Sequence, residues 1–280
     1  MSASIPRPPE ETRPCWAEPL DAARLSPQLE RMFPIRDHNP SGRTPYVTYA
    51  LMAANILIFI GYWPQFTDAR DLNAFFYEWA MVPRMVVENG TYHTVFTSMF
   101  LHGGVMHLLG NMLFLYIFGD NMEDEMGHIG YLAFYLASGI GAGVAHIMAA
   151  PYSPVPTVGA SGAIAGVMGG YLLLFPKAKV DILIIFIFFF RIFTIPAWIM
   201  LALWFGIQLF AGFGADAMQG GVAYWAHAGG FIVGAILTLP VFLARGGRAF
   251  WDRTHGHPPH PDAEYKYVRS NVPTVGRKRR

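Results

Sequence analysis

Two polar side chains in the apolar part of this sequence have the types that acyl-transfer chemistry needs. Ser161 lies in the run VGASGAIAG, where glycine and alanine neighbours leave room for a peptide backbone to approach a hydroxyl. His227 lies in AHAGGFIVG, and an ionisable residue inside an apolar segment is a functional candidate because its burial is costly. We predict that Ser161 is a nucleophile and that His227 is its general base.

Each motif also has an ordinary structural interpretation. A serine in a membrane helix often donates to its own preceding turn, and the spacing of Gly162, Gly166 and Gly170 is common on helix-packing faces. A neutral histidine near the start of a span can also be an interfacial residue. Taken singly, neither motif decides between catalysis and packing.

A third run, HGGVMHLLGNM, places His107 and Asn111 one helical turn apart. An imidazole N–H and a side-chain amide are suitable donors to an oxyanion. The alternative is a metal site formed by His102 and His107. Their spacing does not share one helix face, and no cysteine or carboxylate lies near them to complete a zinc shell. We predict no metal or other cofactor, and we expect His102 to brace the adjoining loop.

Glycines near these residues predict how the site is assembled. His227, Gly230 and Gly234 share one face of a predicted helix. We expect this face to pack against the stripe that begins at Gly162, which would bring the imidazole to the hydroxyl. Gly159 and Gly162 flank the nucleophile and are predicted to support the site.

The composition predicts a membrane-embedded helical bundle to carry these groups. Hydrophobic residues make up 53% of the chain and charged residues only 14%, against about 25% in soluble domains. We predict an all-α membrane protein with six transmembrane helices, since a crossing needs about 17 to 25 residues. The predicted spans are 46–63, 100–118, 129–150, 158–175, 196–213 and 225–243.

The segment between the fourth and sixth spans decides this count. Its first part, 182–193, is too short to cross a bilayer and contains Arg191, so we expect it to lie at the membrane interface. Pro196 then starts the fifth span. That span is bulky and poor in glycine, and we expect it, including Trp204 and Phe205, to pack loosely and to act as a gate toward lipid.

Basic residues predict the orientation of the bundle. Residues 1–45 contain six arginines and residues 244–280 contain nine lysines or arginines, whereas the loop 64–99 has only two arginines. The positive-inside rule then places both termini in the cytoplasm. We expect a disordered tail over 1–45, a membrane domain over 46–243 and a basic tail over 244–280. His107, Ser161 and His227 would then lie near the external face.

The remaining composition excludes several classes. The single cysteine, Cys15, allows no intrachain disulfide, and no nucleic-acid recognition motif accompanies the basic residues. The first 45 residues lack the apolar core of a signal peptide. We expect an integral, multi-pass protein of a bacterial inner (plasma) membrane, whose partners are the lipid bilayer and single-span transmembrane protein substrates.

The four segments HGGVMHLLGNM, GDNMEDEMG, VGASGAIAG and AHAGGFIVG, in this order, resemble a rhomboid intramembrane serine protease. The resemblance covers about residues 46–243. It implies a six-helix bundle that cleaves transmembrane proteins through a Ser161–His227 dyad without a carboxylate. It also implies that His107 and Asn111 are oxyanion donors beside the Ser161 backbone N–H.

Two positions depart from the family pattern. The stretch from Tyr92 to Thr94 stands where many members have a Trp-Arg pair. Ala165 stands where some members have a tyrosine that supports the base, so His227 needs another partner, for which Tyr224 or a glycine-lined contact is a candidate.

Two other functions fit parts of the sequence. An inert relative that binds membrane clients would have lost Ser161 or His227, and both are present. A transporter would need polar groups that continue to the cytoplasmic side, whereas these spans are polar near one side only.

Overall fold

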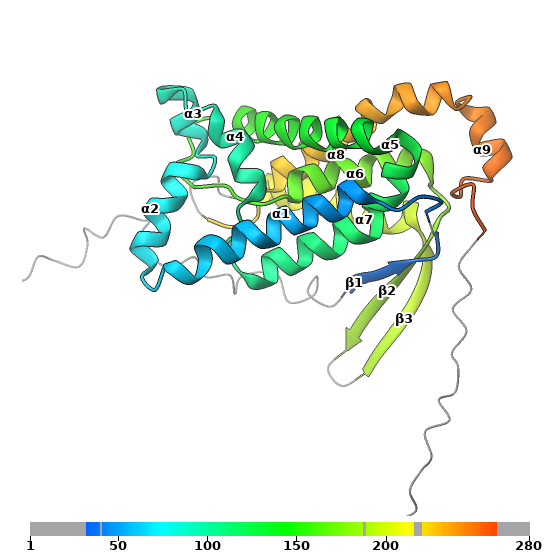
Figure 1. Ribbon diagram of the computed structural model, residues 1–280, viewed down its shortest axis with the longest axis horizontal. Helices are drawn as coiled ribbons and strands as arrows, with labels where there is room; N and C mark the ends of the chain where they lie inside the picture. Colours follow the sequence, from blue (N-terminus) through cyan, green and yellow to red (C-terminus); the bar gives the residue numbers. More distant parts are fainter. Residues whose placement is uncertain (1–31, 40, 187–188, 216–219, 262–280) are drawn as a thin grey trace, which may run out of the picture.

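The computed structural model describes residues 32–39, 41–186, 189–215 and 220–261 as a helical bundle with a small sheet at one end (Figure 1). The elements in chain order are β1 (Met32–Asp37), α1 (Tyr46–Tyr62), η5 (Trp63–Gln65), α2 (Ala69–Trp79), α3 (Pro83–Asn89), α4 (His93–Thr97), η6 (Ser98–Phe100), α5 (Val105–Ala149), α6 (Ser161–Leu174), β2 (Lys179–Phe186), β3 (Phe189–Pro196), α7 (Ala197–Gly214), α8 (Tyr224–Ala244) and α9 (Arg248–Thr254).

The outer surface of the bundle is apolar, as a protein in lipid requires. Four helices of the described chain, α1, α5, α7 and α8, are long and apolar enough to cross a membrane. Large apolar side chains face outward on them, including Leu57 at 68% exposure, Phe210 at 85% and Ile236 at 61%. An exposed apolar surface on this scale marks contact with a membrane or partner. The chain is therefore a multi-pass membrane protein.

The long helix α5 is two helices joined at a kink. Gly127 has φ 70° and ψ 163°, a conformation outside the helical region that glycine adopts without a steric cost. The arms 105–126 and 128–149 are each roughly 33 Å long at about 1.5 Å per residue. Helices were expected over 100–118 and 129–150, and the two arms cover most of both ranges.

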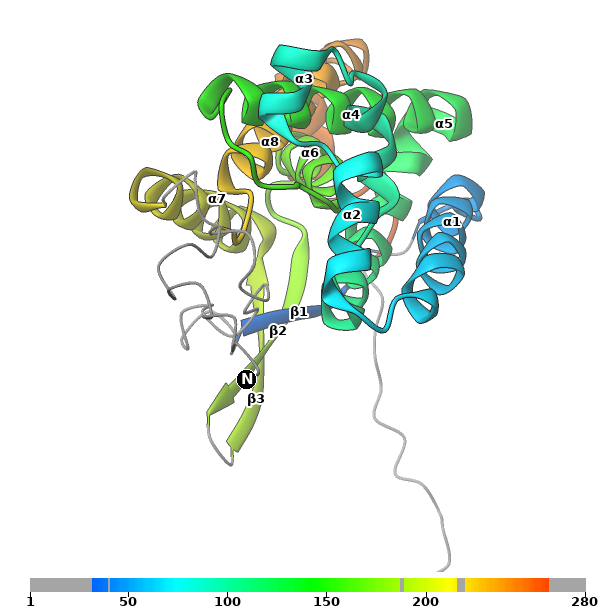
Figure 2. The ribbon, with the colours of Figure 1, turned by 90° about the vertical axis from the view of Figure 1, so that its left-hand side faces the viewer.

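Helix α6 is the centre of the bundle, with α1 and α7 on opposite sides of it (Figure 2). Its first half is rich in small residues, and almost all of its side chains are buried. A Cβ atom at Gly234 of α8 would lie 2.1 Å from the carbonyl oxygen of Gly166, and one at Gly230 would lie 2.1 Å from that of Gly162. The two helices therefore touch backbone to backbone, along the glycine faces that the sequence indicated.

A three-stranded antiparallel sheet corrects the expectation of an all-α protein. β2 pairs with β1 on one side and with β3 on the other, so residues 182–186 and 189–193 of the apolar segment lie in paired antiparallel strands. Asp181 accepts hydrogen bonds from Arg36, His38 and Thr194 at 2.5–2.8 Å. Burial alone would raise the pKa of Asp181, but these bonds hold it below its usual value. Alternating polar and apolar residues were absent here, which hid the strands from the sequence analysis.

Parts of both expected tails are folded. β1 lies within the range 1–45 that was expected to be disordered, whereas residues 1–31 lie outside the described part. Within 244–280, α9 packs on the bundle, because Phe250 is 4% exposed and Trp251 donates to the carbonyl of Leu173 at 3.0 Å. Aromatic side chains thus anchor the start of the basic tail.

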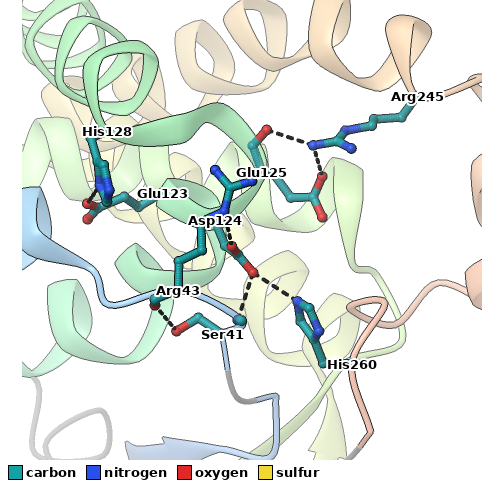
Figure 3. A network of polar contacts seen from close by, with 9 residues as sticks. Ser41, Arg43, Glu123, Asp124, Glu125, His128, Arg245 and His260 are labelled. Atoms are coloured by element: carbon teal, nitrogen blue, oxygen red, sulfur yellow. Dashed lines mark hydrogen bonds and ion pairs between the residues drawn. The ribbon is translucent and has the colours of Figure 1, made fainter.

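Acidic residues just before the α5 kink bond to segments that are distant in the sequence (Figure 3). Glu123 is 2% exposed and accepts from the backbone N–H groups of Val47 and Thr48, both at 2.8 Å. It thereby satisfies donors at the start of α1, which has no cap of its own. His128 also contacts this carboxylate, at 2.6 Å.

The next two acids of the run contact the terminal segments. Asp124 accepts from the backbone N–H of Gly42 at 2.8 Å and lies 2.9 Å from His260 Nε2. Glu125 pairs with Arg245 at 3.0 Å. The kink thus joins the segment before α1 to the segment after α8 (Figure 3).

We predict that Glu123→Ala destabilises the protein, because it leaves two backbone donors of α1, one buried and one half-buried, without an acceptor. Each such group costs about 1–3 kcal/mol. A thermal unfolding series in detergent should show a clearly lower Tm. The control is Glu88→Ala, which removes an exposed carboxylate paired with Arg84. Equal Tm shifts for the two variants would contradict the capping role.

Candidate active site

The predicted site residues meet at the end of the bundle opposite the sheet. His107 is the third residue of α5, Ser161 the first of α6 and His227 the fourth of α8. Three helix starts thus supply the three groups. Helix N-termini carry partial positive charge and unpaired N–H groups, which suits a site where negative charge develops.

Ser161 and His227 are in hydrogen-bond contact. Ser161 Oγ lies 2.8 Å from His227 Nε2, and both side chains remain partly exposed. The glycine contact between α6 and α8 sets this distance, because Gly162 follows Ser161 directly and Gly230 lies about one turn after His227 on the touching faces. The geometry allows the imidazole to take the hydroxyl proton, and exposure lets a reactant reach the oxygen.

The loop before Ser161 is fixed by backbone hydrogen bonds. Thr157 and Met81 exchange two of them, at 2.8 and 3.1 Å, and Gly159 N–H donates to the carbonyl of Ser98 at 2.9 Å. Gly159 has φ 129°, a conformation that L side chains rarely adopt. This loop therefore delivers the chain to the start of α6 in one conformation.

His107 lies beside the nucleophile. The backbone N–H of Gly103 donates to His107 Nδ1 at 3.2 Å, so the neutral ring carries its proton on Nε2. A Cβ atom at Gly159 would lie 2.9 Å from His107 Nε2 and 3.4 Å from Ser161 Oγ. The Nε2–H group thus reaches the space next to Ser161, where an oxyanion donor would be needed.

Asn111 lies one turn along α5. Its side chain is 6% exposed and its Nδ2 donates to the backbone carbonyl of His107 at 3.0 Å. An amide nitrogen has a second hydrogen for a ligand.

His102 is fully buried, with its ring edge-on to His107 at a centroid distance of 5.1 Å. The Tyr62 hydroxyl accepts from the backbone N–H of His102 at 2.8 Å and donates to the backbone carbonyl of His102 at 2.5 Å.

A cavity of about 30 Å³ opens beside Ser161. Glycine and alanine line much of it, among them Gly139, Ala142 and Gly143, together with Met99. One water needs about 10–15 Å³ on this scale, so the space fits a small side chain but no large one. Within the described residues, no group of three or more His, Cys, Asp or Glu side chains is arranged to hold a metal ion.

Two residues of α7 near His227 were missed as site residues. Gln208 Oε1 lies 2.8 Å from His227 Nδ1, and the Trp204 ring lies over the imidazole with a centroid distance of 5.8 Å. The partner of His227 Nδ1 is thus Gln208 rather than the expected Tyr224, and Trp204, expected only to line a gate, contacts the imidazole. One signal was available, since Gln208 is the one amide, hydroxyl or charged side chain in the predicted fifth span, 196–213.

Comparison with known families agrees with this arrangement. The model of the Rhomboid domain matches residues 89–244, more than half of the chain, and this range contains the three helix starts described above. This chain belongs to the rhomboid family. The family assignment from the four sequence motifs is thereby confirmed.

Several named relatives share parts of this rhomboid chain. RHOMBOID-like protein 5 of Arabidopsis thaliana is 35% identical over 32% of this chain and 29% of its own. Rhomboid protease GluP of Bacillus subtilis is 33% identical over 46% of this chain and 24% of its own. Putative rhomboid protease YdcA of Bacillus subtilis is 36% identical over 31% of this chain and 44% of its own.

The chain thus spans less than half the length of each of these relatives. Other plant relatives are named mitochondrial or chloroplastic. The comparisons therefore support a membrane protein of the rhomboid family and do not support our choice of a bacterial inner membrane.

We predict that Gly159→Ala disables the site, because the new methyl group would displace His107 and strain a backbone at φ 129°. Loss of one oxyanion donor typically costs ~10²–10³ in rate. The rate at which a fluorophosphonate labels Ser161 should fall accordingly. Gly110→Ala is the matched control, because nothing lies within 4 Å of its added Cβ. Unchanged labelling in Gly159→Ala would show that His107 does not contribute.

Proposed function

We propose that this protein is an intramembrane serine endopeptidase that cleaves transmembrane protein substrates. The observation that carries the proposal is the 2.8 Å contact between Ser161 Oγ and His227 Nε2 at the start of a buried helix. Membership of the rhomboid family and relatives named as rhomboid proteases support it.

The residues suggest one sequence of steps. Ser161 Oγ attacks the scissile carbonyl while His227 Nε2 takes the hydroxyl proton, and the proton then passes to the leaving amine. Water then attacks the resulting ester while His227 Nε2 takes a proton from it. This proton passes to Ser161 Oγ as the acyl group leaves. The Ser161 backbone N–H, His107 Nε2–H and the Asn111 amide would stabilise the oxyanion. No carboxylate takes part in this scheme.

The length of α6 supports a site within the membrane. Its 14 residues span ~21 Å, whereas the hydrocarbon core is ~30 Å thick. If Leu174 lies at one membrane surface, Ser161 lies roughly 9 Å below the other. Water could reach this depth through the loops before α6, and a membrane-spanning substrate could reach it from the side.

The bundle supports a topology of six crossings. These are α1, the two arms of α5, α6, α7 and α8, which together form the membrane domain proposed over 46–243. Both termini would then lie on one side, and the basic tails favour the cytoplasm. The external side would then hold the starts of α5, α6 and α8.

The substrate is proposed to be a single-span protein cut near the external face. The 30 Å³ cavity beside Ser161 favours a small side chain next to the cleaved bond. A peptide bond inside a helix is hydrogen-bonded and shielded, so attack requires local unwinding. Glycine or proline near the cut should lower that cost.

We predict that the purified protein cleaves a model single-span substrate in proteoliposomes and that Ser161→Ala and His227→Ala each abolish cleavage. The hydroxyl is inert without its base, so neither residue alone suffices. Product termini, mapped by mass spectrometry, should lie in the external half of the span and beside a small residue.

Folding of both variants is checked by Tm, and Leu57→Ala, at an exposed position on α1, serves as an active control. Residual turnover in either variant equal to that of the wild type would refute the dyad. Cleavage in the cytoplasmic half of the span would refute the proposed topology.

Asn111→Ala should lower kcat more than it raises KM, because an oxyanion donor acts only in the transition state. The expected loss in kcat is ~10²–10³. Steady-state kinetics over a substrate series in proteoliposomes separates the two constants. A change mainly in KM would assign Asn111 to substrate binding instead.

A further inference from the structure

Gln208 is a buried polar residue of α7 that faces the proposed base. It is 7% exposed, and its Oε1 lies 2.8 Å from His227 Nδ1. The Trp204 ring, one turn earlier on α7, covers the imidazole. One face of α7 thus contacts His227 from the side opposite Ser161.

Only one tautomer of His227 can act as a base toward Ser161. A neutral imidazole has one N–H and one lone pair, on different nitrogens. Nε2 must hold the lone pair to accept the Ser161 proton, so the ring proton must be on Nδ1. The Gln208 carbonyl oxygen is an acceptor only, and it therefore stabilises the Nδ1–H form.

We propose that Gln208 is a positioning residue that holds His227 in its reactive tautomer and orientation. The inference rests on the proposed serine protease function. The amide occupies the place that a carboxylate has in a Ser-His-Asp triad. It also directs its carbonyl dipole at the imidazolium that forms when His227 takes the proton, which stabilises the charge during the reaction.

The surroundings explain why an amide is suited to this position. An ionised carboxylate in an apolar bundle would cost several kcal/mol of desolvation while the histidine is neutral. A neutral amide has no such cost in the resting state. Helix α6 offers no alternative partner, because the residue one turn after Ser161 is Ala165, which is fully buried and has only a methyl group.

The test compares Gln208→Met with Gln208→Glu. Methionine keeps the length of the side chain but removes the acceptor, whereas glutamate keeps an oxygen that can accept from Nδ1. We expect Gln208→Met to lower kcat ~10- to 100-fold, a fraction of the effect of full general-base catalysis, with little change in KM. Fluorophosphonate labelling of Ser161, which needs no transmembrane substrate, should fall in parallel. Gln208→Glu should recover part of both rates, because it restores the acceptor oxygen but its carboxylate costs desolvation.

Leu57→Ala, on α1 and 68% exposed, should behave as wild type. Equal losses in Gln208→Met and Gln208→Glu, or a normal kcat in Gln208→Met, would overturn the proposal. Solution NMR of ¹⁵N-histidine-labelled protein gives a second readout that needs no variant at Gln208. The resonance absent from His227→Ala should report a proton on Nδ1, and a proton on Nε2 would refute the inference directly.

These outcomes are separable from failure of the proposed function. If Ser161→Ala retains cleavage, the protease mechanism is wrong irrespective of Gln208. If Ser161→Ala is inactive and Gln208→Met is fully active, the dyad stands and only the positioning role is lost.

Discussion

The backbone contact between α6 and α8 is the interaction on which the arrangement of this protein depends. Carbonyl oxygens of Gly162 and Gly166 occupy the space that a Cβ at Gly230 or Gly234 would fill. In lipid, where burying apolar side chains brings little gain between helices, such close packing is a main source of helix association. It also fixes the distance between Ser161 and His227, so that stability and site geometry have the same cause. Helix α7 is less buried, and it can contribute to the site through single side chains rather than through a closely packed face.

Polar groups are divided between the two ends of the bundle. At one end, Glu123 caps α1, and Asp124 and Glu125 hold the segments on either side of the membrane domain. At the other end, three helix starts present histidine, asparagine and serine. Between them, a buried hydroxyl such as Thr238 bonds to a carbonyl of its own helix, at 2.8 Å from Gly234 O. This distribution leaves few polar groups facing lipid, where an unpaired one would be costly.

The proposed mechanism needs little buried charge in the resting state. Ser161, His227 and Gln208 form a line of neutral groups joined by two hydrogen bonds of 2.8 Å. Charge would appear only when His227 takes the proton and the oxyanion forms, and the two opposite charges would then be neighbours. Neutral groups of this kind are suited to a site below the membrane surface, because the resting enzyme then buries no charge. Charge forms only in the transition state, where hydrogen-bond donors are already in place to stabilise it.

The sequence alone determined the long apolar helices, the family and the residues proposed for catalysis. Long apolar runs predict helices because lipid forces the backbone to satisfy its own hydrogen bonds, and the motifs around Ser161 and His227 indicate the family. Local pattern could not predict the strands Lys179–Phe186 and Phe189–Pro196, because pairing with β1, distant in the chain, decides their conformation. The role of Gln208 was hidden for the same reason. A single polar residue in a span is visible in the sequence, but only the packing of α7 against α8 decides that it faces Nδ1 of His227.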